Sequence, residues 1–404
     1  MVIVTEVSPS YRALLAIPGL PRLIASMLLA RLAGQMTSLI IVLFALEHYG
    51  SPAVAGAATF LAIFPGLVGS PIAGALLDRH GRTRLVVLDY AVAALSLALI
   101  AVLALLDALP VPLLLLIVTV TSLTFPLSHT GVRTLFPMLV PPAMWERANA
   151  IDSNGYVVSS VFGPALAGSL VAFFGAPAAL FVTAAISGLA AVVALGLRDP
   201  STRTESGALL RDAWRGLVYV ARHPSLRSLA ISVSVANIGW GLFFITLPVL
   251  VLQRLGGDAA YVGNLFALLG VTGSVTVLLM GRVSTRGREH LFLAGAMLGQ
   301  AVAFAIALFA GGDGRLVAVA MLILGVATGP FDVTLFTVRQ RRTDPAWMGR
   351  AFAVSMSLNF VGFPVGSAIG GALVPISLEG ALAAAIVANV AAALLAQRLP
   401  REPG

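Results

Sequence analysis

The chain has 404 residues, of which 59% are hydrophobic and only 10% are charged. Soluble domains carry about 25% charged residues, so this composition excludes an ordinary soluble enzyme. The net charge is +8 and cysteine is absent, which excludes a disulfide framework, a thiol nucleophile and a metal site built on thiolates.

Long apolar runs recur along the whole chain, and each is long enough to cross about 30 Å of hydrocarbon as a helix. A membrane β-barrel would instead need short segments of alternating polarity. The sequence therefore predicts an all-α membrane protein with twelve transmembrane helices in two pseudo-symmetric six-helix halves. The predicted spans are 20–46, 53–77, 85–106, 111–138, 147–173, 176–197, 226–252, 259–281, 290–310, 315–339, 348–373 and 377–397.

The first span carries a charge well inside the membrane. No short apolar core with a cleavage site precedes it, so no removable signal peptide is expected. Arg31 lies about eleven residues, roughly 16 Å, into this span, and a guanidinium at that depth needs a cavity or a partner. Gln35 and Ser38 follow on the same face. We expect the three to line a substrate or coupling cavity. The alternative is a structural Arg31 paired with a carboxylate, for which Asp332 is the expected partner.

A short charged turn joins spans 2 and 3 and contains Gly74, Asp78, Arg79, Gly81 and Arg82. An acid and several arginines are costly in lipid, so this turn must lie at a water interface. Its arginines anchor the cytoplasmic side, while Asp78 can cap a helix terminus or pair with an arginine. The sequence therefore predicts part of a cytoplasmic gate here.

Spans 4 and 5 carry further polar residues, namely His129, Arg133, Asp152 and Asn154. A histidine can titrate near neutral pH, although a lone one is more often only hydrogen-bonded. Asp152, like Asp89 in span 3, enters its span near the cytoplasm and is expected to pair with an arginine. The candidate partners are Arg82, Arg84, Arg133 and Arg147.

Ladders of small residues repeat between spans 5 and 11 with a constant offset of 203 residues. Span 5 carries Ser159, Gly163, Pro164 and Gly168, and span 11 carries Gly362, Gly366 and Gly370. Small residues one turn apart let another helix approach closely. Two interpretations stay open: plain helix packing, or faces that separate and close during transport.

The only substantial polar stretch, 198–225, divides the chain into an N-terminal half, 1–197, and a C-terminal half, 226–404. Apolar residues recur within it at helical spacing from Leu209 to Ala221, with arginines between them. This pattern predicts an amphipathic helix that lies along the cytoplasmic face.

The second half offers fewer candidates. Asn237 and Trp240 in span 7 correspond by the repeat to the region of Gln35 and are expected to line the same cavity. Asp332 follows Pro330 in span 10, and a carboxylate inside a membrane can carry a proton. The alternative for Asp332 is a structural pair with Arg31, Arg133 or Arg339.

The distribution of the 25 basic residues, all of them arginine, predicts the orientation. With the N-terminus inside, 22 lie on the cytoplasmic side, while only Arg254 and Arg315 lie outside and Arg31 lies within a span. The positive-inside rule then places both termini in the cytoplasm. The basic balance thus reflects topology, with some attraction to anionic lipid, and not a nucleic-acid partner.

These motifs resemble those of the major facilitator superfamily of secondary transporters. The turn from Gly74 to Arg82 resembles its loop 2–3 motif, and the stretch from Ser159 to Gly168 resembles the span 5 motif of its drug:proton antiporters. Ser159 stands for the first glycine of that motif and Ala167 for the first of its final pair. Span 1 from Arg31 to Gln35, and the run from Arg133 to Asn149, look like the bacterial branch that includes siderophore and multidrug exporters.

The resemblance implies a monomeric, proton-driven exporter of small amphipathic molecules in the bacterial inner membrane, which works by alternating access. Importers of a small polar solute and lipid or lysolipid flippases are the alternatives, and a membrane sensor without transport activity is a further one. No Walker loop, metal-ligand spacing or Ser with a paired base is present. We therefore expect no enzymatic activity, no cofactor and no metal.

Overall fold

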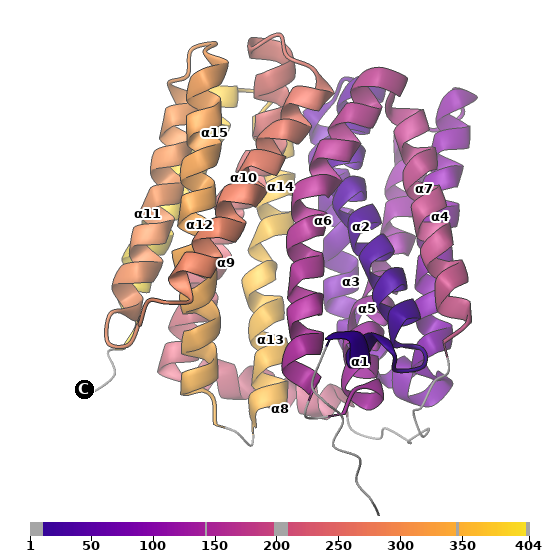
Figure 1. Ribbon diagram of the computed structural model, residues 1–404. Helices are drawn as coiled ribbons and strands as arrows, with labels where there is room; N and C mark the ends of the chain where they lie inside the picture. Colours follow the sequence, from indigo (N-terminus) through magenta and orange to yellow (C-terminus); the bar gives the residue numbers. More distant parts are fainter. Residues whose placement is uncertain (1–10, 142–143, 198–208, 345–346, 401–404) are drawn as a thin grey trace, which may run out of the picture.

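The structure is a computed structural model that describes residues 11–141, 144–197, 209–344 and 347–400 (Figure 1). The regular elements in these residues are helices that stand side by side as a bundle, and twelve of them are long and apolar enough to span a membrane. The predicted all-α fold with two six-helix halves is confirmed.

The first half begins with the short helix α1 (Tyr11–Leu15) and contains six spans. These are α2 (Leu20–Tyr49), α3 (Pro52–His80), α4 (Arg82–Leu105), α5 (Val111–Leu139), α6 (Trp145–Phe174) and α7 (Ala176–Leu195). The linker helix α8 (Leu209–Arg222) follows. The second half contains α9 (Pro224–Val249) with a π-helical end (Leu250–Arg254), α10 (Ala259–Met280), α11 (Glu289–Leu308), α12 (Gly314–Arg342), α13 (Met348–Phe360), α14 (Gly362–Leu373) and α15 (Leu378–Ala396).

The helix ends follow local sequence signals. Ser51, Asp258 and Ser377 each accept a hydrogen bond from a backbone N–H of the first turn that follows them, as N-capping residues do. Every predicted span boundary lies within three residues of a helix end.

Span 11 differs from its prediction as one continuous helix, because it is broken at Val361 into α13 and α14. Pro364 has no N–H to donate to the carbonyl of Phe360, and its ring clashes with that carbonyl. The neighbouring carbonyl, of Asn359, instead accepts a hydrogen bond of 2.8 Å from the side-chain amide of Asn237. A proline and a tertiary contact together end α13.

The turn between spans 2 and 3 is shorter than predicted. Helix α3 continues to His80 and α4 begins at Arg82, so only Gly81 separates them. Gly81 has a φ of 92°, a backbone conformation that side chains disfavour. One glycine therefore reverses the chain at the point where the sequence predicts a loop.

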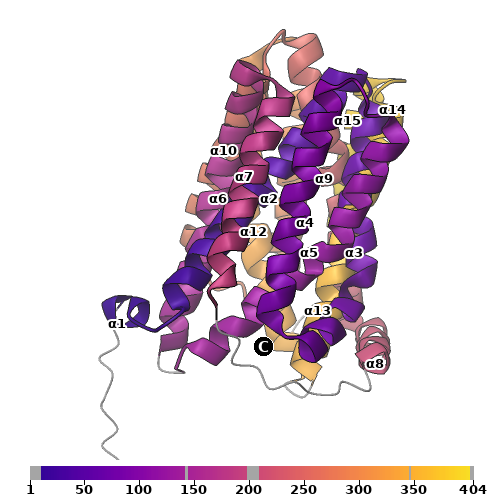
Figure 2. The ribbon, with the colours of Figure 1, turned by 90° about the vertical axis from the view of Figure 1, so that its right-hand side faces the viewer.

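The two halves meet mainly through two helix pairs, α3 with α14 and α6 with α10, while α2 and α3 also touch α9. We call the end of the bundle at which α8 lies the α8 end, and we call the opposite end the distal end (Figures 1 and 2). Helices α3 and α10 begin at the distal end, and α6 and α14 end there.

A candidate translocation site and the seam between the halves

Arg31 of α2 reaches Asp152 on α6. Its Nη2 lies 2.6 Å from Oδ1 of Asp152, and its Nη1 donates to the backbone carbonyl of the same residue at 2.7 Å. The side chains of Arg31 and Asp152 are 11% and 22% exposed. A charge that would be costly in the membrane is therefore paired.

Tyr156 joins this ion pair to α5. The Arg31 guanidinium lies 3.8 Å above the centre of the Tyr156 ring. The Tyr156 hydroxyl accepts a hydrogen bond of 3.3 Å from Arg133 and lies 3.2 Å from Nε2 of His129. We name Arg31, His129, Arg133, Asp152 and Tyr156 the central cluster.

The central cluster is open on one side, because His129 and Arg133 are exposed although both lie on a membrane span. Asn154 on α6 is exposed as well. Ionisable side chains within spans face a protein interior or a water-filled space. The arrangement can therefore present charge and hydrogen-bonding groups to a polar or ionisable solute.

The second half holds an arginine in a related way. Arg339 of α12 is fully buried and donates to the Ser355 hydroxyl at 3.1 Å. The Asn359 amide, with its oxygen turned toward Arg339, accepts another bond. Ser355 and Asn359 lie 203 positions after Asp152 and Tyr156. The same two positions of the repeat thus contact an arginine in each half, although the two arginines come from non-equivalent spans, α2 and α12.

The expected partner of Arg31 is wrong: the structure pairs Arg31 with Asp152 and not with Asp332. Asp152 forms the ion pair expected of it, but with none of the four arginines named from the sequence. Asp89 is buried on α4 and lies beside the hydroxyls of Ser128 and Thr124. Asp332 is partly buried on α12, and it lies 203 positions after His129.

The remaining cavity candidates make mostly packing contacts. Ser38 is exposed and donates to the carbonyl of Gly34 within α2 at 3.0 Å. Gln35 is the side chain against which Gly163 packs. Asn237 donates to α13 as described above, and Trp240 packs at 6.0 Å from the ring of Phe243. Among the described residues, the hydrogen bonds and the ring contact of Arg31 go to Asp152 and Tyr156 and to none of these four.

The predicted gate turn is described only in part. Arg79 is exposed, and Arg82 donates from Nε to the Thr134 hydroxyl on α5 at 3.0 Å. The side chain of Asp78 and the surroundings of Gly74 lie outside the described part of the chain. The role predicted for Asp78 therefore stays a prediction.

The small-residue ladders make two kinds of helix contact, one within a half and one between the halves. Gly163 packs against α2, and Gly362, Gly366 and Gly370 pack against α9, each within its own half. Pro164 and Gly168 instead face α10 across the halves. A Cβ atom at Gly168 would lie 2.9 Å from the Cα of Gly263. Ser159 is buried.

A second crossing of the halves mirrors the first. A Cβ atom at Gly56 of α3 would lie 2.7 Å from the Cα of Gly371 on α14, and Gly371 is 203 positions after Gly168. We name Gly56, Gly168, Gly263 and Gly371 the distal seam. Contacts this close require glycine, so the halves are packed tightly at the distal end.

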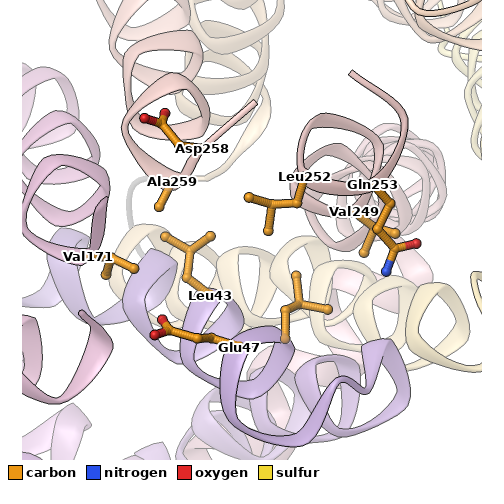
Figure 3. Close-up of a pocket in the computed structure, with 9 residues that line it drawn as sticks. Leu43, Glu47, Val171, Val249, Leu252, Gln253, Asp258 and Ala259 are labelled. Carbon is orange, nitrogen blue, oxygen red and sulfur yellow. The ribbon is translucent and has the colours of Figure 1, made fainter. Parts of the chain in front are cut away.

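A pocket of about 390 Å³ is lined in part by Ala259 (Figure 3). The Ala259 backbone packs against Gly168, so the pocket lies beside the distal seam. Its lining is mostly aliphatic and includes Leu43, Val171 and Leu252, with the carboxylates of Glu47 and Asp258. Glu47 comes from the first half and Asp258 from the second (Figure 3). The pocket is thus shared by both halves.

Comparison with known proteins identifies the family. The sequence family described as Major Facilitator Superfamily matches residues 23–366, and again 229–404. The chain belongs to this superfamily. Its members are transporters and not enzymes.

Individual relatives in the superfamily give finer detail. The chain is 39% identical to an uncharacterised MFS-type transporter, y4rN, of Sinorhizobium fredii, over 97% of each chain. It is 29% identical to the multidrug efflux pump Tap of Mycolicibacterium fortuitum, over 84% of this chain and 86% of Tap. A solved structure of a bacterial homologue of the iron transporter ferroportin superposes with a TM-score of 0.73. It shares 18% identity and covers 93% of this chain and 97% of its own.

Proposed function

We propose that this superfamily member is an alternating-access exporter of small amphipathic molecules, driven by protons. The central cluster is the observation that carries the proposal. It offers paired and exposed ionisable groups at one depth of three spans, α2, α5 and α6. The substrate binds beside this cluster, between the halves.

Alternating access follows from the position of the distal seam. Two symmetry-related glycine crossings close the distal end, while His129 and Arg133 are exposed nearer the α8 end. From the distribution of the arginines, we assign the α8 end to the cytoplasm. A bundle that is closed at the distal end and open toward the α8 end is then in the inward-facing state. Opening of the seam then releases the substrate outside, with the linker 198–225 as the boundary between the moving halves.

Proton coupling is assigned to Asp332. Asp332 and His129 hold equivalent positions in span 10 and span 4, so each half carries a titratable group at this position of the repeat. The protein works as a monomer in the bacterial inner membrane.

The direction of transport rests on composition and on a relative. An importer of polar solutes needs more polar groups in its spans than this chain offers, and Tap is an efflux pump. The alternatives are an importer of a small polar solute and a lipid or lysolipid flippase, and the experiment must distinguish both of them from an exporter.

The test is substrate-induced proton flux in proteoliposomes, screened over cationic, neutral and anionic amphipathic compounds. We expect at least one compound to cross the liposome membrane from the side on which α8 lies, while protons cross in the opposite direction. The Asp332→Asn variant should lose the proton flux. Asp313→Asn is the matched control, because Asp313 caps the start of the same helix and asparagine caps equally well. Substrate movement without proton flux in the wild-type protein would refute the coupling.

A further inference from the structure

An open groove of about 680 Å³ lies along α8, away from the central cluster. It is formed by one face of α8, by the start of α9 and by Trp347, which directly precedes α13. Figures 1 and 2 show α8 lying across the end of the bundle near α13 and α3. The groove therefore lies where a membrane protein meets the headgroup region.

The lining combines positive charge with aromatic surface. Arg215 and Arg222 are exposed at its edge, and Trp214 exposes 65% of its surface. The lining contains no acidic residue among the side chains described. The pKa of His223 is lowered by burial and by the nearby Arg342, so the charge at neutral pH comes from the arginines.

The floor of the groove is held in place by the second half. The Tyr219 ring stacks on the Trp347 ring at 4.9 Å, with an angle of 7° between the planes. The Tyr219 hydroxyl accepts a hydrogen bond of 3.2 Å from the backbone N–H of Asp344. Val220, on the inner side of α8, is buried with Leu226 and Ala230. The groove is thus a preformed surface of the folded protein.

We propose that this groove binds the headgroup and upper acyl region of an anionic phospholipid. Arg215 and Arg222 bind the phosphate, and Trp214 and Trp347 contact the glycerol and the first methylene groups. Basic residues beside an amphipathic helix attract anionic lipid, and tryptophan favours the membrane interface. A soluble phosphate would gain nothing from the exposed tryptophan, so the combination selects a lipid.

The occupant also bridges two parts of the molecule. A lipid in the groove contacts α8 and Trp347 together, and α8 packs against both α3 and α13. Bound lipid therefore stabilises the attachment of the linker helix to the second half.

The test uses the full-length protein, delipidated in detergent and titrated with phosphatidylglycerol, phosphatidylcholine or glycerol phosphate. Bound lipid is counted by native mass spectrometry, and stability is followed by thermal melting. We expect retention of phosphatidylglycerol and a rise in melting temperature with that lipid alone. The double variant Arg215→Gln/Arg222→Gln should weaken retention about tenfold.

The matched control is Arg282→Gln/Arg288→Gln, which removes two exposed arginines from the turn between α10 and α11 at the same end. Equal loss of lipid in both double variants would overturn the proposal, because it would show general charge attraction. Retention of phosphatidylcholine to the same degree, or full competition by glycerol phosphate, would overturn it too. Trp214→Ala keeps both arginines and should still lower lipid retention, which tests the groove if the double variant does not fold.

Discussion

Arg31 shows how one charge inside a span is made tolerable. Its two terminal nitrogens bind the carboxylate and the backbone carbonyl of Asp152, and the Tyr156 ring covers its face. Arginine suits this position because its planar group can bind in two directions and stack at once. The pair is therefore both structural and part of the candidate site.

Arg31→Ala should destabilise the protein, because it leaves the partly buried Asp152 carboxylate without its partner. Breaking a fully buried ion pair costs about 3–5 kcal/mol, which is an upper bound for this partly exposed pair. The double variant Arg31→Ala/Asp152→Asn should recover most of the melting temperature, but not transport. Arg31→Ala/Asp332→Asn is the comparison, and rescue by this second combination instead would show that Asp332 is the true partner.

Tyr156 has two contributions that two variants can separate. Tyr156→Phe keeps the ring beneath Arg31 but removes the hydroxyl between Arg133 and His129. We expect lower transport with a nearly unchanged melting temperature. Tyr156→Leu should also lower stability, since a shielded cation–π contact contributes about 2 kcal/mol. Wild-type transport by Tyr156→Phe would remove the hydroxyl from the mechanism.

Asp78 is the residue of the gate turn for which the sequence makes the strongest prediction. Its counterpart in the second half is Thr285, which has no charge to offer. Asp78→Asn should leave membrane insertion intact and strongly lower transport, measured in proteoliposomes. Asp107→Asn makes the same change at a turn where φ is 51°, a conformation that asparagine tolerates. If Asp78→Asn transports as well as this control, the segment is only a turn.

At the scale of elements, the glycines of the distal seam set how closely the halves approach. Gly56 and Gly371 bring α3 and α14 into backbone contact, as Gly168 and Gly263 do for α6 and α10. The ladders within each half, at Gly163 and Gly366, pack spans of the same half. The same small-residue pattern therefore serves packing within a half on one face and packing between the halves on the other, and we propose that only the second contact moves.

Gly56→Ala should loosen the distal seam, because the new methyl group would overlap the backbone of α14. Overpacking of this kind costs about 1–3 kcal/mol. The chain contains no cysteine, so Leu252→Cys in the distal pocket can be labelled selectively with a maleimide. Labelling should become faster in Gly56→Ala. Gly69→Ala on the same helix is the control, because its methyl group would only touch Leu123 at 3.8 Å. Equal labelling rates in the two variants would contradict the role of the seam.

At the scale of the molecule, the orientation in the membrane is testable by itself. Arginine sorting predicts that both termini lie in the cytoplasm. A reporter that is active only in the cytoplasm should therefore give signal when fused after Gly404, and a reporter active only in the periplasm should not. Signal from the periplasmic reporter alone would contradict the topology of twelve spans with both termini in the cytoplasm.

The number, length and order of the spans follow from the sequence alone, and so does the linker helix. Hydropathy and helix-capping residues act locally, so the ends of the twelve spans could be anticipated to within three residues. The repeat of 203 residues also carries the two-half design. The break at Val361 was missed, although Pro364 was a usable local signal.

Only the tertiary structure decided which groups meet. Arg31 and Asp152 are 121 positions apart, and hydropathy does not report which faces of two helices cross. Composition offered several carboxylates for one arginine, and it gave Tyr156 no special status. Packing of α2, α5 and α6 chose Asp152 and Tyr156, because a buried charge is stable only where a partner lies within hydrogen-bonding distance. The sequence determines what must be paired inside this membrane protein, and the crossing of its helices determines with what.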